Sequence, residues 1–323
     1  MEAIDDGEET THEHEHTHNH AHEEISADEE LKIREEVGAF SFKALHKAKD
    51  LVKNGAKLID VAEAVEAYVR ENGFDIAFPL NLSIDSEAAH YTPMLSDEKI
   101  FNGNVVKIDF GVGKKGILGD CATTVDLSGN YQKLLDATEA ALSDAISCVK
   151  AGVPVNQIGK SISEAITSRG FLPIKNLGGH GVRVHDLHSD PFIPNFDNGD
   201  TTKLEEGDVI AIEPFATQKG RGMVGNGDVV EIYSVRYPAQ TRSSVSRLIM
   251  GRIIEKEMVE PFALRWFKDM VKSRFELHAA MRELEKAGAV EPHPMLVELG
   301  GGIVSQHEAE VEVEKGGCKV LTK

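Results

Sequence analysis

Two stretches of the chain share one helical spacing of apolar residues. Residues 55–74 and 152–171 both begin with glycine and end in Gly-Phe at the same distance. Each has β-branched residues at every fourth position: Val61, Val65 and Val69 in the first stretch, and Ile158, Ile162 and Ile166 in the second. Such spacing lines up one buried face of an α-helix. The pattern therefore predicts two equivalent helices, each closed by a glycine.

The features that follow these helices also recur in one order. Each helix is followed by a proline, an Asn-Leu pair and a histidine, which is His90 in one copy and His180 in the other. Further on, "NGNVVKID" (102–109) and "EGDVIAIE" (206–213) each combine a turn with an apolar run that ends in a carboxylate. A helical pattern also precedes each copy.

This shared order predicts a tandem duplication of a helix–helix–strand–strand unit. Two short helical matches could also arise by chance from common apolar periodicity, but the agreement in order favours repetition. Duplicated units that pack about a pseudo-twofold axis bring equivalent ends together. We therefore expect an α/β (α+β) fold in which each half supplies a histidine and at least one acid to a central site.

The remaining segments extend this body, which we assign to residues 28–323. A long helical pattern starts at Asp28 and is predicted to end at Gly55. Residues 225–300 carry two amphipathic helical patterns, which indicates an inserted α-rich subdomain. The last element alternates from Ile303 onward and predicts a strand with one solvated polar face. That polar face carries Gln306, Glu308, Glu310 and Glu312.

Residues 1–27 form an acidic, histidine-rich tail. Six histidines alternate with other residues from His12 to His22, and apolar residues are too few to offset the entropy of ordering, which predicts disorder. Such a tail cannot build the fixed, partly dry cage that a catalytic metal requires. One hypothesis is that it binds divalent ions loosely and raises their local concentration. The alternative is a solvated low-complexity or artificial extension.

Charge and cysteine content narrow the function classes. The formal net charge is −19, but residues 1–30 hold twelve acidic residues and no lysine or arginine, so the body is only mildly acidic. Direct nucleic-acid binding is therefore disfavoured. The three cysteines form no disulfide framework or CxxC motif, which suits a reducing cytoplasm. Because no apolar stretch approaches ~18 residues, we expect a cytoplasmic protein without a membrane segment.

Two aspartates lie in neighbouring apolar runs. Asp109 ends "VVKID" and Asp120 opens "DCATTV", with "GKKG" between the two runs. If Lys114-Lys115 forms a two-residue hairpin turn, the two carboxylates stand directly opposite each other on one face. Opposed buried carboxylates are destabilising unless a proton or a cation lies between them. The simpler alternative is that one aspartate is a loop residue.

Further candidates follow in the second half. His180 comes directly after two glycines, where backbone can approach a ligand closely, and His188 shares its face if the stretch is extended. Glu213 ends an apolar run, where an acid without a partner is rare. Glu308 alone is a weak candidate, because its neighbours look solvated. Together, two Asp, two Glu and one His suit a pair of divalent ions bridged by carboxylates.

Eight segments, taken in order, resemble a known family. They are "AFPLNLSIDSEAAHYTP" (77–93), "VVKIDFGV" (105–112), "GDCATTVDL" (119–127), "NLGGHGV" (176–182), "IEPFAT" (212–217), "PFALRWF" (261–267), "LEKAGAV" (284–290) and "GIVSQHE" (302–308). The chain resembles the type II methionine aminopeptidases of archaeal type, in the M24 metallopeptidase family. The resemblance covers residues 30–323. It implies the pseudo-symmetric "pita-bread" fold with a winged-helix-like insertion.

The resemblance implies a metal centre with five ligands: Asp109, Asp120, His180, Glu213 and Glu308. In it, Asp120 and Glu308 would bridge two divalent ions (Co, Mn, Fe or Zn), and His180 would bind one of them.

The implied activity is removal of the initiator methionine from nascent peptides, with a preference for a small second residue. Hydroxide activated by two metal ions would attack the methionine carbonyl, and Glu213 would pass its proton to the leaving amine. His90 and His188 would contact the scissile amide and the intermediate. Phe78 and His293 would line the pocket for the methionine side chain. The implied partners are nascent peptides and, with them, the ribosome; the implied state is a monomer.

The sequence departs from the family pattern in two places. The usual Gln-Phe-Glu-His around the last ligand is here "QHEA" (306–309), whose His307 should point away from the metals. The common Tyr-Pro before the last strand is here "HP" (293–294). Position 293 lines the methionine pocket in relatives, so the polarity of the pocket differs.

Two other interpretations stay open at this point. A protein with this fold that has lost catalysis would be a binding module, although such relatives lose metal ligands and all five are present here. An aminopeptidase that cleaves before proline shares the fold, but usually carries an extra N-terminal domain. Metal-dependent turnover tests the first alternative, and a comparison of Met-Ala with X-Pro peptides tests the second.

Overall fold

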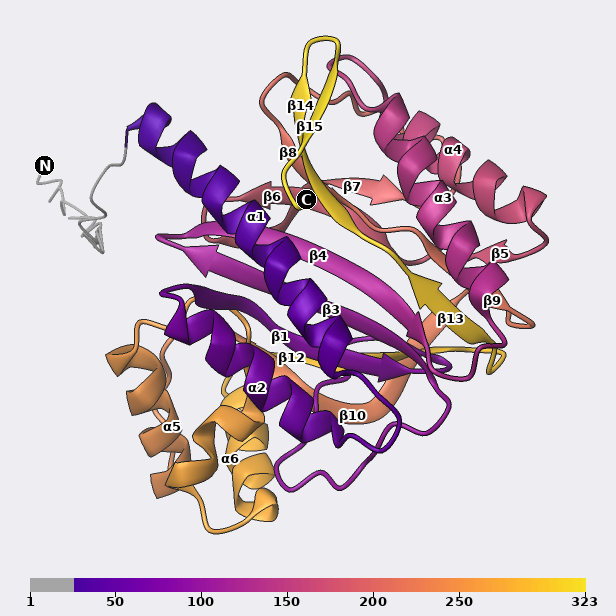
Figure 1. Ribbon diagram of the computed structural model, residues 1–323. Coiled ribbons are helices and arrows are strands. Elements are labelled where there is room, and N and C mark those ends of the chain that lie inside the picture. The colour runs from indigo at the N-terminus through magenta and orange to yellow at the C-terminus, as the bar shows by residue number, and fades with distance from the viewer. Residues whose placement is uncertain (1–25) are drawn as a thin grey trace, which may run out of the picture.

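The computed structural model describes residues 26–323 (Figure 1). The histidine run and all but the end of the predicted disordered tail lie outside the described residues. The hydroxyl of Ser26 accepts the Glu29 amide N–H and caps the first helix, as serine commonly does. That helix ends at Leu51, before the predicted stop at Gly55, which lies in the following turn with a φ of 88°.

The first half of the body consists of two helices and four strands. In chain order they are α1 (Ala27–Leu51), α2 (Leu58–Glu71), β1 (Asp75–Ile84), β2 (Glu87–Ala89), β3 (Val105–Lys114) and β4 (Ile117–Asp126). Strands β1, β3 and β4 form an antiparallel sheet in that order. The apolar faces of α1 and α2 pack on this sheet in one hydrophobic core.

The second half repeats two helices followed by strands. Its elements are α3 (Gln132–Cys148), α4 (Val155–Ser168), β5 (Leu172–Pro173), β6 (Gly178–Arg183), β7 (Asp186–Pro194), β8 (Val209–Ile212), β9 (Phe215–Gln218), β13 (Ile303–Gln306), β14 (Ala309–Glu314) and β15 (Gly317–Val320). One sheet has the order β15-β14-β8-β6-β7 and another the order β13-β9-β5. The last strands of the chain therefore complete the sheets of the second half.

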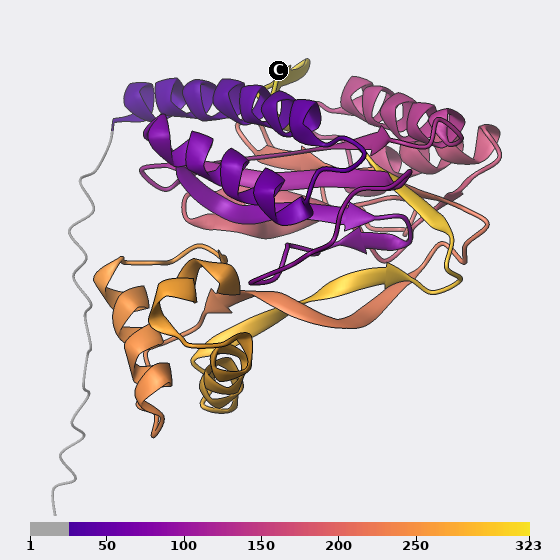
Figure 2. The same cartoon turned by 60° about the horizontal axis from the view of Figure 1, so that its bottom comes forward.

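The predicted repeat is confirmed in α2 and α4. The two helices have the same length, and their stripes of valine and isoleucine are buried. Each is followed by a glycine with positive φ, 79° at Gly73 and 83° at Gly170, a conformation that side chains disfavour. In Figure 2, α1 to α4 lie in one layer over the strands. This α/β arrangement is the predicted fold class.

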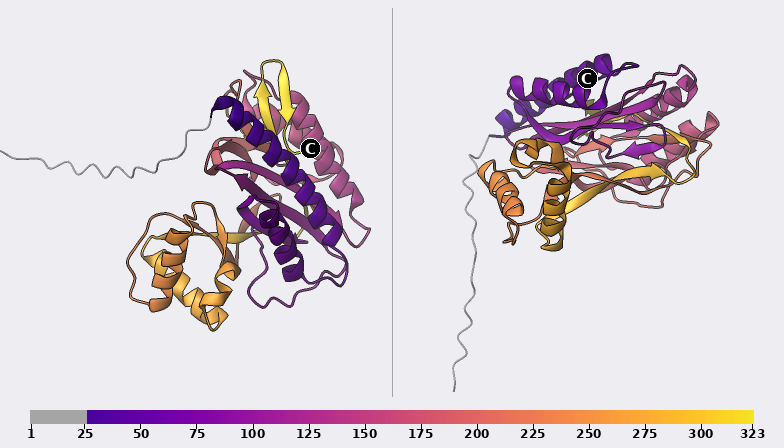
Figure 3. Two further views of the ribbon diagram at one scale, coloured as in Figure 1. Left: turned by 60° about the vertical axis from the view of Figure 1, so that its left-hand side comes forward. Right: turned by 90° about the horizontal axis from the view of Figure 1, so that it is seen from below.

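Residues 224–298 carry strands as well as helices. They form β10 (Val224–Val235), α5 (Ser244–Glu255), β11 (Phe262–Ala263), the 3-10 helix η1 (Leu264–Met270), α6 (Arg274–Lys286) and β12 (Val290–Glu298). The helices share a separate hydrophobic core and project from the body (Figure 3). β12 pairs with β2 of the first half, and Arg265 forms a buried ion pair with Glu66 of α2. These contacts tie the insertion to the first half.

No helix within residues 26–323 is long and apolar enough to cross a membrane.

Candidate active site

One cavity of about 460 Å³ collects the predicted side chains. Its walls include every residue expected to hold metal or substrate: Phe78, His90, Asp109, Asp120, His180, His188, Glu213, His293 and Glu308. These residues come from both halves of the duplicated body and from the insertion. The fold therefore brings together residues that are far apart in the sequence.

Asp109 and Asp120 project from neighbouring strands of the first half. Asp109 on β3 pairs with Ala122, and Asp120 on β4 pairs with Gly111. The predicted register, with the two aspartates directly opposite, is wrong by two residues. A shift of two preserves the face of a strand, so both carboxylates still lie on one face, as diagonal neighbours.

The turn of this hairpin explains the error. The ladder closes at Lys114 paired with Ile117, so the turn consists of Lys115 and Gly116 rather than the two lysines. Their φ values are 52° and 77°. A two-residue turn with positive φ at both positions matches the twist of the strands, and glycine adopts this conformation readily. The position of Gly116 therefore sets the register.

Glu213 and Glu308 lie at matching breaks in two paired strands. Glu213 follows β8 just before β9 begins, and Glu308 lies between β13 and β14. The antiparallel pairing keeps one register on both sides of the break, so the two glutamates occupy opposed positions. Like charges directly opposed across strands repel each other, which makes this position suited to a cation.

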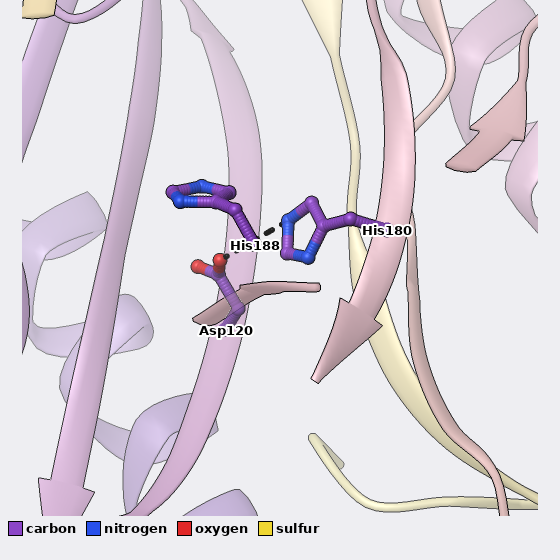
Figure 4. Close-up of side chains that lie close together, drawn as sticks. All are labelled: Asp120, His180 and His188. Carbon is purple, nitrogen blue, oxygen red and sulfur yellow. Dashed lines mark ion pairs between the residues drawn. The ribbon is translucent and has the colours of Figure 1, made fainter. Parts of the chain in front are cut away.

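His180 and His188 lie on the two strands of the β6–β7 hairpin, so the condition of one extended stretch is not met. Their ring centroids are 4.6 Å apart. His180 Nε2 lies 3.7 Å from Asp120 Oδ2 and 3.9 Å from Glu213 Oε1. Figure 4 shows Asp120, His180 and His188 converging, and one ligand atom from each lies within 4.8 Å of the others. His180 Nδ1 faces the Gly181 carbonyl at 3.1 Å, so a proton there leaves Nε2 free to bind metal.

Burial dominates the electrostatics of the cluster. Burial and, to a smaller extent, the nearby Asp120 carboxylate together raise the pKa of Asp109 to about 8. Burial raises the pKa of Asp120 to about 7. Burial and the neighbouring carboxylates raise the pKa of Glu213 and Glu308 well above the usual range. Burial lowers the pKa of His180 to about 4, so its ring is neutral. Without a cation, the site thus disfavours the charged form of every carboxyl group.

The donor set fits a metal centre. Among the described residues, both Glu308 carboxylate oxygens and Asp120 Oδ1 are buried without a hydrogen-bond partner. Glu308 belongs to two groups of three candidate ligands, and within each group the ligand atoms lie within 4.8 Å of one another. One group is Asp109, Asp120 and Glu308, and the other is His180, Glu213 and Glu308. Buried carboxylates without donors are costly unless a cation binds them. Carboxylates and one imidazole suit a divalent ion of intermediate hardness.

The opposite wall of the cavity is aromatic. The ring centroid of Phe78 lies 5.6 Å from that of His90, 5.5 Å from that of His188 and 5.9 Å from that of His293. His293 Nε2 lies 2.6 Å from the Ser234 hydroxyl oxygen on β10. A mostly apolar wall with a few placed polar groups suits an uncharged side chain.

Sequence reasoning missed two residues that support the cluster. Gln306 Nε2 donates to Asp109 Oδ2 at 3.0 Å and to Glu213 Oε2 at 3.2 Å. Glu310 is 1% exposed and accepts the Asp120 amide N–H, so the expectation that it belongs to a solvated face is wrong. The sequence held one sign of this role: Gln306 and Glu310 each lie two residues from Glu308 and so share its strand face.

His307 points away from the cluster, as predicted. Its Nδ1 lies 2.8 Å from the Thr138 hydroxyl oxygen on α3. The departure from the family pattern at this position therefore faces the helix layer.

The fold and the site together define a metallopeptidase. A model of metallopeptidase family M24 matches residues 33–234, and the chain belongs to this family. Within it, the chain is 42% identical to the methionine aminopeptidase of Archaeoglobus fulgidus, over 89% of this chain and 97% of the relative. It is 40% identical to the methionine aminopeptidase of Saccharolobus solfataricus, over 88% and 95%.

A solved structure shows the same fold at lower identity. A thermophilic Arx1 superposes with a TM-score of 0.77 at 18% identity, covering 92% of this chain and 91% of that one. At this identity the likeness concerns the fold alone. The named relatives favour a methionine aminopeptidase over either alternative, the inactive binding module or the X-Pro aminopeptidase.

Proposed function

We propose that this chain is a metal-dependent aminopeptidase that removes methionine from the N-terminus of peptides and proteins. The observation that carries the proposal is a cavity in which a largely buried cluster of acids and one histidine faces an aromatic wall. The relatives at about 40% identity, which are named methionine aminopeptidases, support it.

The proposed cofactor is a pair of divalent ions, Co, Mn, Fe or Zn, held by Asp109, Asp120, His180, Glu213 and Glu308. Glu308 belongs to two groups of candidate ligand atoms, which supports a count of two. When bound, such ions supply a water nucleophile of lowered pKa and stabilise negative charge on the carbonyl oxygen.

The chain's own residues then have separate tasks. Glu213 faces the cavity and is oriented by Gln306, so it is placed to take a proton from water and return it to the leaving amine. Desolvation and neighbouring histidines lower the pKa of His90 and His188, so both rings are neutral and can hydrogen bond to the scissile amide. His188 is the more exposed of the two. Phe78 and His293 contact the methionine side chain. The preference for a small second residue is proposed from the relatives named methionine aminopeptidases.

We propose that the substrates are nascent chains near the ribosome in the cytoplasm. We further propose that the protein acts as a monomer and does not bind nucleic acid directly. The three cysteines, all free, suit that compartment.

A peptide assay tests the proposed function. Protein stripped of metal is given Mn, Fe, Co or Zn and then a Met-Ala-Ser peptide or an X-Pro peptide. Release of free methionine that depends on metal, with little cleavage before proline, is expected. Faster cleavage of the X-Pro peptide would favour the second alternative instead.

A further inference from the structure

Lys107 is a fully buried lysine on β3, two residues before Asp109 and on the same face of the strand. Its Nζ donates to the Asp85 carbonyl oxygen at 2.8 Å and lies 3.5 Å from the Val105 carbonyl oxygen. Burial lowers the pKa of Lys107 to about 7, against the opposing effect of Glu87 and Asp85. Both protonation states of the amine carry N–H donors, so this contact persists across neutral pH.

Asp85 connects the first half of the body to strand β13, near the C-terminus of the chain. It lies in the turn between β1 and β2 with a φ of 53°, a conformation that side chains disfavour. Its carboxylate accepts the Asn104 side-chain amide at 2.7 Å and the Val105 N–H at 3.0 Å. Its carbonyl oxygen accepts both Lys107 Nζ and the Val304 N–H, the latter at 3.0 Å. One oxygen thus joins β3 of the first half to β13.

The backbone N–H groups of Val304, Gln306 and Glu308, at every second residue of β13 and its extension, donate hydrogen bonds to the first half. The Gln306 N–H donates to the Thr124 hydroxyl at 2.9 Å, and the Glu308 N–H donates to the Ala122 carbonyl at 2.9 Å. Both acceptors lie on β4, the strand that carries a proposed metal ligand. These three contacts set where Gln306 and Glu308 lie relative to the first half.

We propose that Lys107 is a positioning residue for the metal centre. By holding the Asp85 carbonyl, it fixes the first of the three contacts and with it the placement of Glu308 relative to Asp109. Within residues 26–323, no hydrogen bond or ion pair joins Lys107 to a proposed ligand, so it acts through this connection. Residues that orient metal ligands typically change metal affinity or activity by about 10–100-fold when they are replaced. The inference rests on the proposed metal-dependent function.

Two substitutions and one matched control test it. Lys107→Met keeps the length of the side chain but removes its donor, whereas Lys107→Gln keeps an N–H donor on a shorter chain. Lys99→Met is the control, because Lys99 is exposed and lies 3.6 Å from Glu87, so it removes positive charge from the same neighbourhood. Each folded protein is titrated with Mn or Co by calorimetry. Hydrogen exchange over residues 303–308 is measured in parallel.

The expected result is a rise of about tenfold or more in metal Kd for Lys107→Met, a smaller rise for Lys107→Gln and none for Lys99→Met. Exchange over 303–308 should be faster in Lys107→Met. A merely structural role would lower the melting temperature and leave metal Kd within about twofold of the wild-type value, and this result would overturn the inference. If Lys107→Met does not fold, an unchanged Kd in Lys107→Gln overturns it equally. Wild-type protein that binds no metal would instead contradict the proposed function.

Discussion

The Glu310 carboxyl group accepts the backbone N–H of Asp120 at 3.0 Å. The contact holds β14, which follows Glu308, against β4, which carries Asp120. Burial raises the pKa of Glu310 to about 8, so its neutral acid form predominates near neutral pH. A neutral carboxyl group next to the cluster adds no further negative charge to it.

Two replacements of Glu310 should show how much its hydrogen bond contributes to stability. Glu310→Gln keeps an oxygen acceptor and is expected to have nearly wild-type stability. Glu310→Met leaves the Asp120 N–H unpaired and should lower the free energy of unfolding by about 1–3 kcal/mol. Denaturant unfolding of the metal-free proteins measures the difference. Equal stability of the two variants would contradict this role.

The five proposed ligands should be essential for turnover but not for folding. We expect Asp109→Ala, Asp120→Ala and His180→Ala each to abolish peptide hydrolysis, because each removes a ligand from the cluster. Thermal unfolding in the presence of a chelator should show folded proteins, since loss of Asp109 or Asp120 relieves repulsion within the cluster and His180→Ala removes only a neutral ring. Glu312→Gln, on the same strand as Glu310 but outside the cavity, is the control. Normal turnover in any of the three alanine variants would refute the ligand assignment.

Metal binding should release protons near neutral pH. The pKa values of Asp109 and Asp120 in the metal-free protein are raised to about 8 and about 7, from an ordinary value of 3.8. A group with a raised folded pKa holds protons that the unfolded chain has lost, so these two aspartates destabilise the metal-free protein increasingly as pH rises from about 4 to about 8. A bound cation requires the ionised form.

Calorimetric titrations with Mn at about pH 6.5, in two buffers of different ionisation enthalpy, measure this release. The observed enthalpies should differ between the buffers, and the difference should shrink at about pH 9. Identical enthalpies at the lower pH would show that the carboxyl groups are already ionised.

His293→Ala should weaken substrate binding without impairing the chemical step. The His293 ring packs edge-on against Phe78 in the wall opposite the cluster. Loss of this contact should raise KM for Met-Ala-Ser by roughly tenfold and leave kcat and metal Kd unchanged. Ser234→Ala, which removes only the hydroxyl that holds the ring, should have a smaller effect. A fall in kcat at constant KM would instead place His293 in the chemistry.

Removal of residues 1–25 should leave kcat unchanged at saturating metal. If the histidine run gathers divalent ions, the shortened protein should recover activity more slowly when limiting metal is returned after chelation. Replacing only the six histidines from His12 to His22 by serine separates their effect from that of the acids. Equal recovery of all three proteins would leave the tail without a role in metal loading.

Local apolar spacing was sufficient to predict the duplicated helices. A helix buries one stripe wherever it packs, so the stripes in α2 and α4 and the glycines after them could be recognised without knowing the partner elements. The resemblance of the motifs then identified the residues that line the cavity.

Features that depend on other elements could not be predicted in the same way. Register in the β3–β4 hairpin depends on which two residues take positive φ, and "GKKG" offers more than one choice. Alternation along the last strand indicates which residues share a face, but not that β4 covers the face of Glu310. The hydrogen bonds of Lys107 and Gln306 likewise join segments that meet only in the folded chain.

The most direct test of the central claim is release of free methionine from Met-Ala-Ser by the wild-type protein, before and after removal of bound metal. We predict no release from the stripped protein and restored release when Mn, Fe, Co or Zn is added back. Release that persists in a chelator, or no release with any of the four metals, would contradict the account.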